Sequence, residues 1–186
     1  MLAAGRGRRM GFAKHMYALD GVPLLERVVR VLGATAVTPI RVVLRPGDRA
    51  GAELAKSLAA TPIFAESADE GRAASIRAAV RATRSDAGGL LVALADQPFL
   101  EPADFDALLA EFGRAAQGIV RARYAGEPGT PVIFSRAYFP ELLRLEGRDG
   151  GRRVIAANDA DVRFVDLDPV RGRDLDTPED LPARKT

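Results

Sequence analysis

Short apolar runs alternate with longer amphipathic stretches along the first part of this chain. Gly89–Ala95 is apolar without polar alternation, which is typical of a parallel strand covered on both faces. In Pro23–Leu32 the apolar residues recur at helical spacing and predict one buried helix face. The predicted strands of this part are Met1–Ala4, Ile40–Leu44, Thr61–Phe64 and Gly89–Ala95. The predicted helices are Pro23–Leu32, Arg49–Ala59, Arg72–Thr83 and Pro102–Phe112.

The rhythm changes after about residue 117, where a turn-rich connection at 125–129 joins two predicted strands. Strand–helix alternation over most of the chain predicts an α/β fold with three α/β/α layers and a mostly parallel, Rossmann-like sheet. At 186 residues, one domain spanning 1–186 is expected. The later strands are predicted at Gly118–Tyr124, Thr130–Phe134 and Val162–Leu167, and the later helices at Arg136–Leu145 and Arg152–Asn158.

Composition narrows the kinds of chemistry open to the chain. It has no cysteine, so disulfides, thiolate nucleophiles and cysteine metal sites are excluded. Its only histidine is His15, which excludes a histidine-cluster zinc site and is better suited to packing or hydrogen bonding than to catalysis. The net charge of +2 and the lack of a basic stripe with aromatics argue against nucleic acid. No apolar run approaches a membrane span and no secretory segment is recognisable, so a cytoplasmic location is expected.

Residues 5–14 combine glycines with fixed positive charge. The glycines permit positive φ and close approach of a ligand to the backbone. Bare N–H groups beside cations suit an anion, most plausibly a polyphosphate. The segment matches neither a Walker A loop nor a G-x-G-x-x-G turn. The glycines are Gly5, Gly7 and Gly11, and the basic residues are Arg6, Arg8, Arg9 and Lys14.

Asp96 directly follows the predicted strand 89–95. In an open α/β sheet, ligands bind beyond the carboxyl ends of the strands, so Asp96 is expected near the glycine-rich loop. A carboxylate there suits Mg²⁺ shared with substrate phosphates. The alternative is that Asp96 only begins a turn before Pro98.

Two further segments each allow two interpretations. Among Asp166, Asp168, Asp174 and Asp176, either of the last two is a candidate second metal ligand, although residues 176–180 also read as a helix start. Gly71 and Ser75 open a predicted helix and suit contact with a nucleobase edge, whereas the residues alone favour a serine on a surface helix.

Five motifs together resemble a known family. The chain is similar to nucleotidyltransferases with a GT-A-like fold, in the MobA-like NTP transferase family. Ala4, supported by Gln97 and the Gly71–Ser75 helix start, resembles the molybdenum cofactor cytidylyltransferase branch more than the guanylyl branch. The matching motifs are Leu2–Lys14, Leu94–Pro98, Gly129–Phe134, Leu142–Gly147 and Leu175–Leu181.

The resemblance implies transfer of CMP from CTP to molybdopterin with release of pyrophosphate, Mg²⁺ as cofactor and a molybdoenzyme as recipient of the product. It divides the domain into a nucleotide-binding half, 1–116, and an acceptor-binding half, 117–186. The implied catalytic residues are Arg9, Lys14 and Asp96. The implied nucleotide-binding residues are Leu2, Ala3, Ala4, Gly5, Arg9, Lys14, Gly71, Ser75 and Asp96. The implied metal ligands are Asp96 and Asp176.

Three departures from the family pattern leave alternatives open. Only Met1 precedes the Leu-Ala-Ala-Gly motif, so we expect either a start further upstream or a shortened first strand. Thr130 and Arg148 stand where the family often has histidine and aspartate, in segments expected to face the acceptor. The alternatives are GTP or another NTP as donor, another small phosphate acceptor, and a non-catalytic molybdenum cofactor chaperone.

Overall fold

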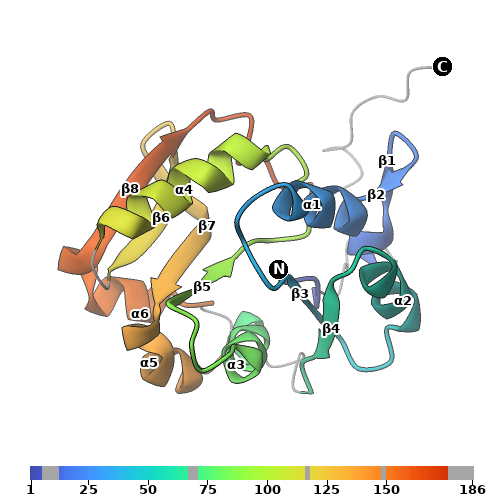
Figure 1. The fold of residues 1–186 in the computed structure, drawn as a ribbon, viewed down its shortest axis with the longest axis horizontal. Coiled ribbons are helices and arrows are strands. Elements are labelled where there is room, and N and C mark those ends of the chain that lie inside the picture. The colour runs from blue at the N-terminus through green and yellow to red at the C-terminus, as the bar shows by residue number, and fades with distance from the viewer. Residues whose placement is uncertain (6–12, 67–70, 116–117, 148–149, 176–186) are drawn as a thin grey trace.

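The computed structural model describes residues 1–5, 13–66, 71–115, 118–147 and 150–175. Figure 1 shows strands through the middle of the molecule with helices on both sides. The strands are β1 (Ala18–Leu19), β2 (Val22–Pro23), β3 (Arg41–Leu44), β4 (Thr61–Phe64), β5 (Gly89–Val92), β6 (Ile119–Tyr124), β7 (Glu127–Ser135) and β8 (Val162–Leu167). The α-helices are α1 (Leu24–Gly33), α2 (Arg49–Ser57), α3 (Arg72–Ala82), α4 (Pro102–Arg114), α5 (Phe139–Leu143) and α6 (Arg152–Ala157).

The first residues of the chain join two groups of strands into one layer. β3 pairs in parallel with β4, and a second group has the order β5-β7-β6-β8. Leu2 forms parallel bridges to Val43 on one side and to Leu94 on the other. Its N–H donates to the Ala93 carbonyl at 2.8 Å, and its carbonyl accepts from Ala95 at 3.1 Å. The predicted strand 89–95 therefore continues past β5 as the neighbour of residues 1–3.

β7 is the one strand of this layer, within the described residues, that runs against the others. It is antiparallel to both β5 and β6, while β6 pairs in parallel with β8. The predicted α/β fold with a mostly parallel sheet is thus confirmed. The direction of β7 follows from the tight connection at 125–126, since a hairpin reverses the chain.

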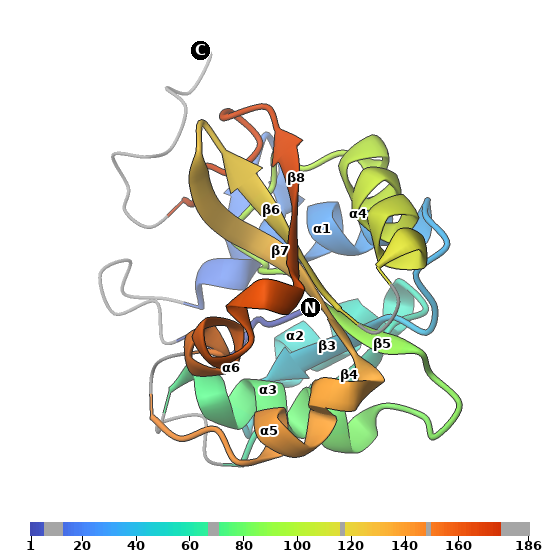
Figure 2. The same ribbon diagram turned by 90° about the vertical axis from the view of Figure 1, so that its left-hand side faces the viewer.

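Alternation along the central strands sends side chains into two separate cores. Met1, Ala3 and Val42 pack with residues of α1, α2 and α4 on one face. Leu2 and Val43 pack on the other face with residues of α3, α5 and α6. Figure 2 shows α1 and α4 on one side of the strands and α3 and α5 on the other. Because every central strand is covered on both faces, its apolar residues need no polar alternation.

Local sequence explains where several helices begin. Asp48 precedes α2, and its carboxylate accepts from the Gly51 N–H at 2.9 Å. Pro102 lies in the first turn of α4, where Asp104 accepts from the Glu101 N–H at 2.8 Å. The apolar residues of α1 recur at helical spacing, and they form the buried face of the helix as predicted.

The structure differs from the predicted elements at two places. The helix predicted at 136–145 is a 3₁₀ turn, Arg136–Tyr138, followed by the short α5 with Pro140 in its first turn. The proline lacks an N–H and so favours a new helix start there. A ribbon of β1 and β2 was not predicted, and its turn residues Asp20 and Gly21 both have positive φ, as a tight hairpin requires.

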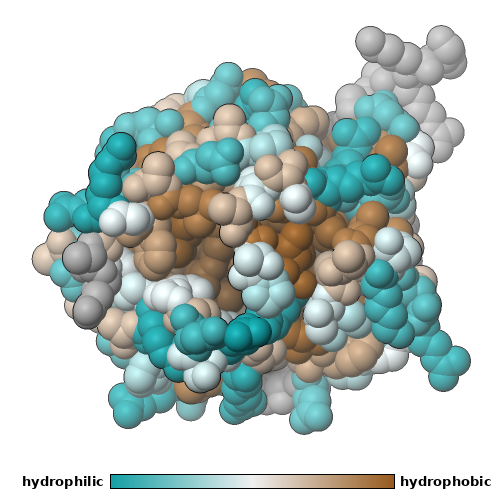
Figure 3. Space-filling view, viewed as in Figure 1, coloured by the Kyte–Doolittle hydropathy of each residue, from teal (hydrophilic) through white to brown (hydrophobic). Residues whose placement is uncertain are grey.

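An apolar cavity of about 460 Å³ opens beside the amino terminus. Figure 3 shows a hydrophobic hollow near the centre of the face seen in Figure 1. The cavity lies at the amino ends of β3 and β5, at the opposite edge of the sheet from Asp96. Its apolar lining includes Met1, Leu32, Ile40, Ala79, Leu90 and Leu91.

Candidate active site

The carboxyl edge of the sheet gathers the predicted functional segments that the structure describes. Residue 5 leaves the first strand there, and Asp96 follows the strand that ends at Ala95. Lys14 opens a 3₁₀ turn, Lys14–Met16, that returns the chain to this edge. Arg9 and Asp176 lie outside the described residues.

Lys14 and Asp96 form an ion pair at this edge, although 82 positions separate them in the chain. Lys14 Nζ donates to Asp96 Oδ2 at 2.7 Å. The two side chains are only 13% and 24% exposed. The second oxygen, Asp96 Oδ1, is buried and has no hydrogen-bond partner among the described residues. A buried carboxylate oxygen without a donor is a costly arrangement, and a bound cation would satisfy it.

Hydrogen bonds on both sides hold the turn that carries Asp96. The Asp96 carbonyl accepts from the Leu175 N–H at 3.0 Å, which brings the C-terminal segment against the site. The neighbouring Gln97 is 3% exposed. Its amide oxygen accepts from Thr130 Oγ1 at 2.8 Å, and its amide nitrogen lies 3.4 Å from the Gly172 carbonyl. Asp96 is therefore positioned by two distant segments, β7 and the 172–175 segment, and not by its own turn alone.

This network shows why a simple turn-starting role does not account for Asp96. A turn residue ahead of proline would point its side chain at nearby backbone. Asp96 instead directs one carboxylate oxygen at Lys14 and buries the other without a partner. The residue types present fit a hard cation that also contacts phosphate oxygens.

The backbone predicted to meet the nucleotide is partly occupied by the sheet. The Leu2 N–H donates to Ala93, and the Ala3 N–H donates to Val43 at 2.8 Å. These two N–H groups are therefore committed to the strands. Ala4 is buried, whereas Gly5 is exposed, and no described residue lies within 4 Å of a Cβ built on it. Gly5 is where the chain leaves the sheet with space for a ligand.

Arg45 is a site-edge residue that the sequence reasoning missed. It follows β3, and its guanidinium lies 3.5 Å from the Ala4 carbonyl. Arg45 could have been found from its position directly after a predicted apolar strand, because the same reasoning identified Asp96. Arg45 adds a cation beside the start of the glycine-rich loop.

Gly71 and Ser75 lie at the amino end of α3, which follows β4 and so faces the same edge. Gly71 has φ +109°, a value that strongly favours glycine. Ser75 is 5% exposed, so the surface-helix interpretation is wrong. The Gly147 carbonyl accepts from the Ala73 N–H at 3.4 Å, so a predicted acceptor segment meets the predicted base-binding helix. Contact of Gly71 and Ser75 with a base remains a prediction.

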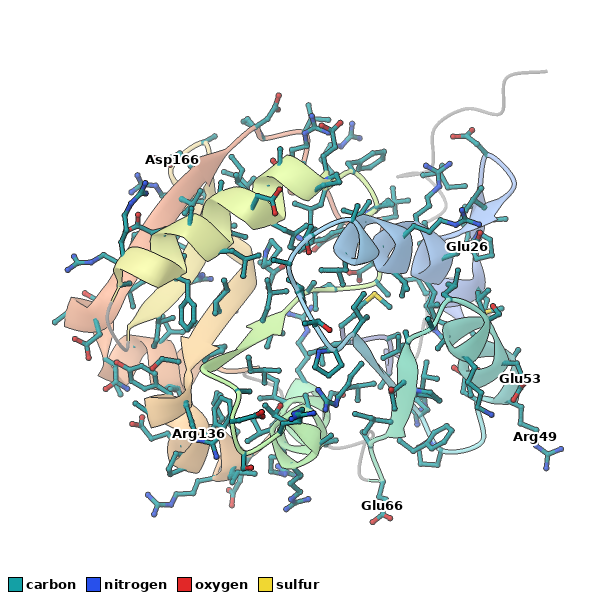
Figure 4. All side chains as sticks on the ribbon, viewed as in Figure 1. Glu26, Arg49, Glu53, Glu66, Arg136 and Asp166 are labelled. Atoms are coloured by element: carbon teal, nitrogen blue, oxygen red, sulfur yellow. The ribbon has the colours of Figure 1, made fainter. Side chains whose placement is uncertain are left out.

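The acidic residues of the C-terminal region serve different purposes. Asp166 pairs with Arg123 through two contacts of 2.6 and 2.7 Å, on the outer strand β8 (Figure 4). Asp168 accepts from the Val170 N–H at 2.9 Å. Asp174 is exposed, and the buried Leu175 anchors the segment against Asp96. This anchoring keeps the segment that leads to Asp176 beside the site.

His15 packs inside the molecule next to Lys14. Its Nε2 lies 2.8 Å from Asp48 Oδ2, and the residue is 5% exposed. Burial lowers the pKa of His15 below its usual range and outweighs the Asp48 carboxylate, which acts to raise it. The predicted packing role is confirmed. His15 anchors the 3₁₀ turn that presents Lys14.

Within the described residues, no three acidic or histidine side chains gather closely enough to hold a metal by themselves. A cation at Asp96 would therefore need substrate phosphates or another ligand, which is the usual arrangement for Mg²⁺.

Across the described part of the chain, no helix has the length and apolarity that crossing a membrane demands.

The comparisons with known proteins agree with this geometry. Residues 1–162 match the family described as the MobA-like NTP transferase domain. The chain belongs to this family. A molybdenum cofactor guanylyltransferase of Rhodobacter capsulatus is 31% identical over 185 aligned residues, which cover 97% of this chain and 90% of the relative. The purine catabolism protein PucB of Bacillus subtilis (strain 168) is 28% identical over 190 aligned residues, covering 96% and 91%.

Solved structures with the same fold also match the chain. The crystal structure of Rv0371c from Mycobacterium tuberculosis matches with a TM-score of 0.81 at 30% identity, covering 96% of this chain and 92% of that one. A further structure of that protein is a complex with manganese. This MobA-like chain is thus a nucleotidyltransferase, and its carboxyl-edge site lies where an α/β fold binds its ligands.

Proposed function

We propose that the protein transfers a nucleoside monophosphate from a nucleoside triphosphate to the phosphate of a molybdopterin-type acceptor. The observation that carries the proposal is the Lys14–Asp96 pair at the carboxyl edge, in which the other carboxylate oxygen is buried and has no hydrogen-bond partner among the described residues. Lys14 lies at the end of a glycine- and arginine-rich loop, next to a carboxylate that can bind a metal ion. This combination suits a triphosphate. The 31% identical guanylyltransferase supports the acceptor class.

The reaction is a direct displacement. An oxygen of the acceptor phosphate forms a bond to the α-phosphorus, and the bond from the α-phosphorus to the oxygen bridging to the β-phosphate breaks. Pyrophosphate leaves with that oxygen and its electron pair. No covalent protein nucleophile is needed, which fits a chain with no cysteine and one histidine.

The residues of the chain supply charge and position. Lys14 and Arg9 neutralise the β- and γ-phosphates and stabilise the leaving pyrophosphate. Asp96 holds Mg²⁺, with Asp176 as the proposed second ligand. When bound, the ion neutralises charge on the α-phosphate and orients the two reacting phosphates. Gln97 and Leu175 hold the Asp96 turn in place by the hydrogen bonds described above.

The identity of the nucleotide base is a separate part of the proposal. Ala4 in the Leu-Ala-Ala-Gly motif favours CTP, and we propose CTP as the donor. GTP is the second candidate, because the relative from Rhodobacter capsulatus is a guanylyltransferase. Gly71 and Ser75, on the helix that follows β4, are proposed to lie near the base whichever nucleotide binds.

The test is pyrophosphate release from CTP, GTP, ATP or UTP with Mg²⁺ and molybdopterin. We expect release with CTP, and release with GTP alone would replace the base assignment. Asp96→Asn should lower the rate about a hundredfold or more, since it removes the metal carboxylate. Asp166→Asn is the control and should keep the rate, because Asp166 on β8 pairs with Arg123 on the neighbouring strand β6. Tight molybdopterin binding without pyrophosphate release from any nucleotide would instead identify a cofactor chaperone.

A further inference from the structure

Arg121 on β6 and Arg152 at the start of α6 lie in the half of the chain that is proposed to bind the acceptor. Within the described residues, neither arginine forms an ion pair with a carboxylate. A neighbouring arginine differs, because Arg123 binds Asp166 through two contacts of 2.6 and 2.7 Å. Arg121 is half-buried and Arg152 is exposed. A half-buried cation without an anion is unfavourable, and a bound anion would relieve that cost.

Backbone carbonyls at the start of β7 fix the guanidinium of Arg121. Its Nε donates to the Gly129 carbonyl at 3.0 Å, and its Nη2 donates to the Pro128 carbonyl at 3.2 Å. The next residue, Thr130, donates to Gln97 beside the Asp96 turn. Nη1 of Arg121 donates to no described residue. A planar guanidinium that is held in place and keeps donors in reserve is preorganised to bind an anion.

Arg152 begins a helix that covers the face of the sheet to which Arg121 belongs. Ile119 packs in one core cluster with residues of α6, and Arg121, two positions further along β6, points to the same face. Just before α6, a Cβ on Gly151 would lie 3.2 Å from the ring of Phe134, the partner of Ile119 on β7. Burial, and after it the positive charge of Arg152, lower the pKa of Arg121 below its ordinary value. The two cations are therefore near enough to repel each other.

This arginine pair shares its face of the sheet with the candidate active site. The core cluster beneath α6 also contains Leu94, two positions before Asp96. In the order β5-β7-β6, two strand spacings, about 10 Å, separate the strand that leads to Asp96 from β6. Beyond Arg121, its partner Phe164 on β8 is 37% exposed, so the face is open there. Long arginine side chains cover part of the distance, and a small acceptor can span the rest.

We propose that Arg121 and Arg152 form an anion subsite that binds a negatively charged group of the acceptor other than its reacting phosphate. This inference rests on the proposed function in taking a molybdopterin-type acceptor. Such an acceptor has a phosphate and, in addition, two dithiolene sulfurs that are negatively charged as thiolates. An anion between the two arginines replaces their repulsion by two charge-assisted contacts. The subsite therefore selects acceptors with a second anionic group over simple phosphate monoesters.

The test measures anaerobic binding of molybdopterin to the full chain by calorimetry. Arg152→Met removes one charge at an exposed position and should weaken binding about tenfold. Arg152→Lys keeps the charge and should retain most of the affinity. Arg81→Met is the matched control and should bind like the parent chain, because Arg81 is exposed in the last turn of α3, at the opposite edge of the sheet. Equal affinity of Arg152→Met and the parent chain would overturn the inference.

A second arm uses molybdopterin whose two dithiolene sulfurs are alkylated, which removes the second charge and keeps the phosphate. The parent chain should bind this form about tenfold more weakly, and Arg152→Met should bind both forms nearly alike. Equal weakening of both forms by Arg152→Met would contradict the proposal, since the arginines would then bind the phosphate. Arg121→Met should repeat the pattern of Arg152→Met. Thermal melts check its folding, and the Arg152 variants carry the test if it unfolds.

Pyrophosphate release separates this inference from the proposed function. A protein that releases pyrophosphate with molybdopterin, but binds it equally well as Arg152→Met, would disprove the anion subsite only. A protein that releases no pyrophosphate from any nucleotide, but loses molybdopterin affinity in Arg152→Met, would disprove the transfer reaction and leave the subsite standing.

Discussion

At the scale of single residues, the neutral His15 anchors the turn that carries the charged Lys14. It is buried against Asp48 and α2, and a Cβ on Gly51 would lie only 2.9 Å from its Nε2. The close packing leaves little room for water to stabilise a positive imidazole. Burial therefore lowers the pKa of His15 and keeps the ring neutral.

This pKa shift predicts a loss of stability in mild acid. The unfolded chain takes up a proton on His15 below about pH 6.5, while the folded chain resists it, so the free energy of unfolding falls as pH falls. His15→Gln should remove this part of the pH dependence between about pH 6.5 and 5. Urea unfolding of both proteins at pH 7.5 and 5.5 measures it. Equal losses in the two proteins would contradict the prediction, and no other histidine complicates the comparison.

At the scale of elements, Tyr124 joins the β6–β7 hairpin to the 172–175 segment, which contacts Asp96 through Leu175. Its hydroxyl donates to the Thr130 carbonyl at 2.7 Å. Its ring lies against two glycines, Gly129 on β7 and Gly172 in the C-terminal segment, where an added Cβ would approach to 2.6 and 2.7 Å. The absence of side chains at these positions lets the ring fit between the two segments.

Replacing Gly172 should therefore loosen this junction. Gly172→Ala would force the Tyr124 ring to shift and should cost about 1–3 kcal/mol of stability. It should also weaken the contact of Gln97 with the 172 carbonyl and so lower Mn²⁺ affinity at Asp96. Thermal melts and Mn²⁺ titration check both effects. Gly113→Ala in α4 is the matched control, because its Cβ meets nothing within 4 Å and should be neutral or stabilise by about 1 kcal/mol.

At the scale of the whole molecule, three residues hold the two strand groups together. Residues 1–3 lie between β3 and the strand 89–95. By this register, β5 extends past Met1 along the apolar cavity, whose lining includes Ile40, Leu90 and Leu91. The Met1 amino group donates to the Arg41 carbonyl at 2.8 Å, and burial lowers its pKa to about 5, so the group is neutral at pH 7.

An added apolar segment should make this junction stronger. Extending the chain before Met1 by Val-Ile-Val is expected to continue the strand into the cavity, pair with β5 and remove the amino group from its buried position. We expect a rise in melting temperature of several degrees, corresponding to about 1–2 kcal/mol for a chain of this size. A Gly-Ser-Gly extension is the control and should give a smaller rise. Equal melting temperatures for the two extended proteins would contradict strand addition.

The sequence by itself determined most of the elements and pointed to the two central residues of the candidate site. Periodicity is a local property, so the strand 89–95 and the helices α1 to α4 could be read from neighbouring residues. Asp96 and Lys14 were found because both belong to segments that follow predicted strands. The family resemblance rests on the same short motifs, and the match over residues 1–162 confirmed it.

Only the tertiary structure decided which distant residues meet. Three contacts depend on segments that are far apart in the chain. They are the pairing of Lys14 with Asp96, the burial of Ser75 and the packing of the Tyr124 ring between two glycines. The position of β7 between β5 and β6 also depends on such segments. Local patterns carry no information on such distances, because strand order and side-chain packing are settled by the sum of contacts across the whole fold. The candidate chemistry could thus be located from the sequence, while the contact between Lys14 and Asp96 was decided by the tertiary structure, which brings Lys14 Nζ within 2.7 Å of Asp96 Oδ2.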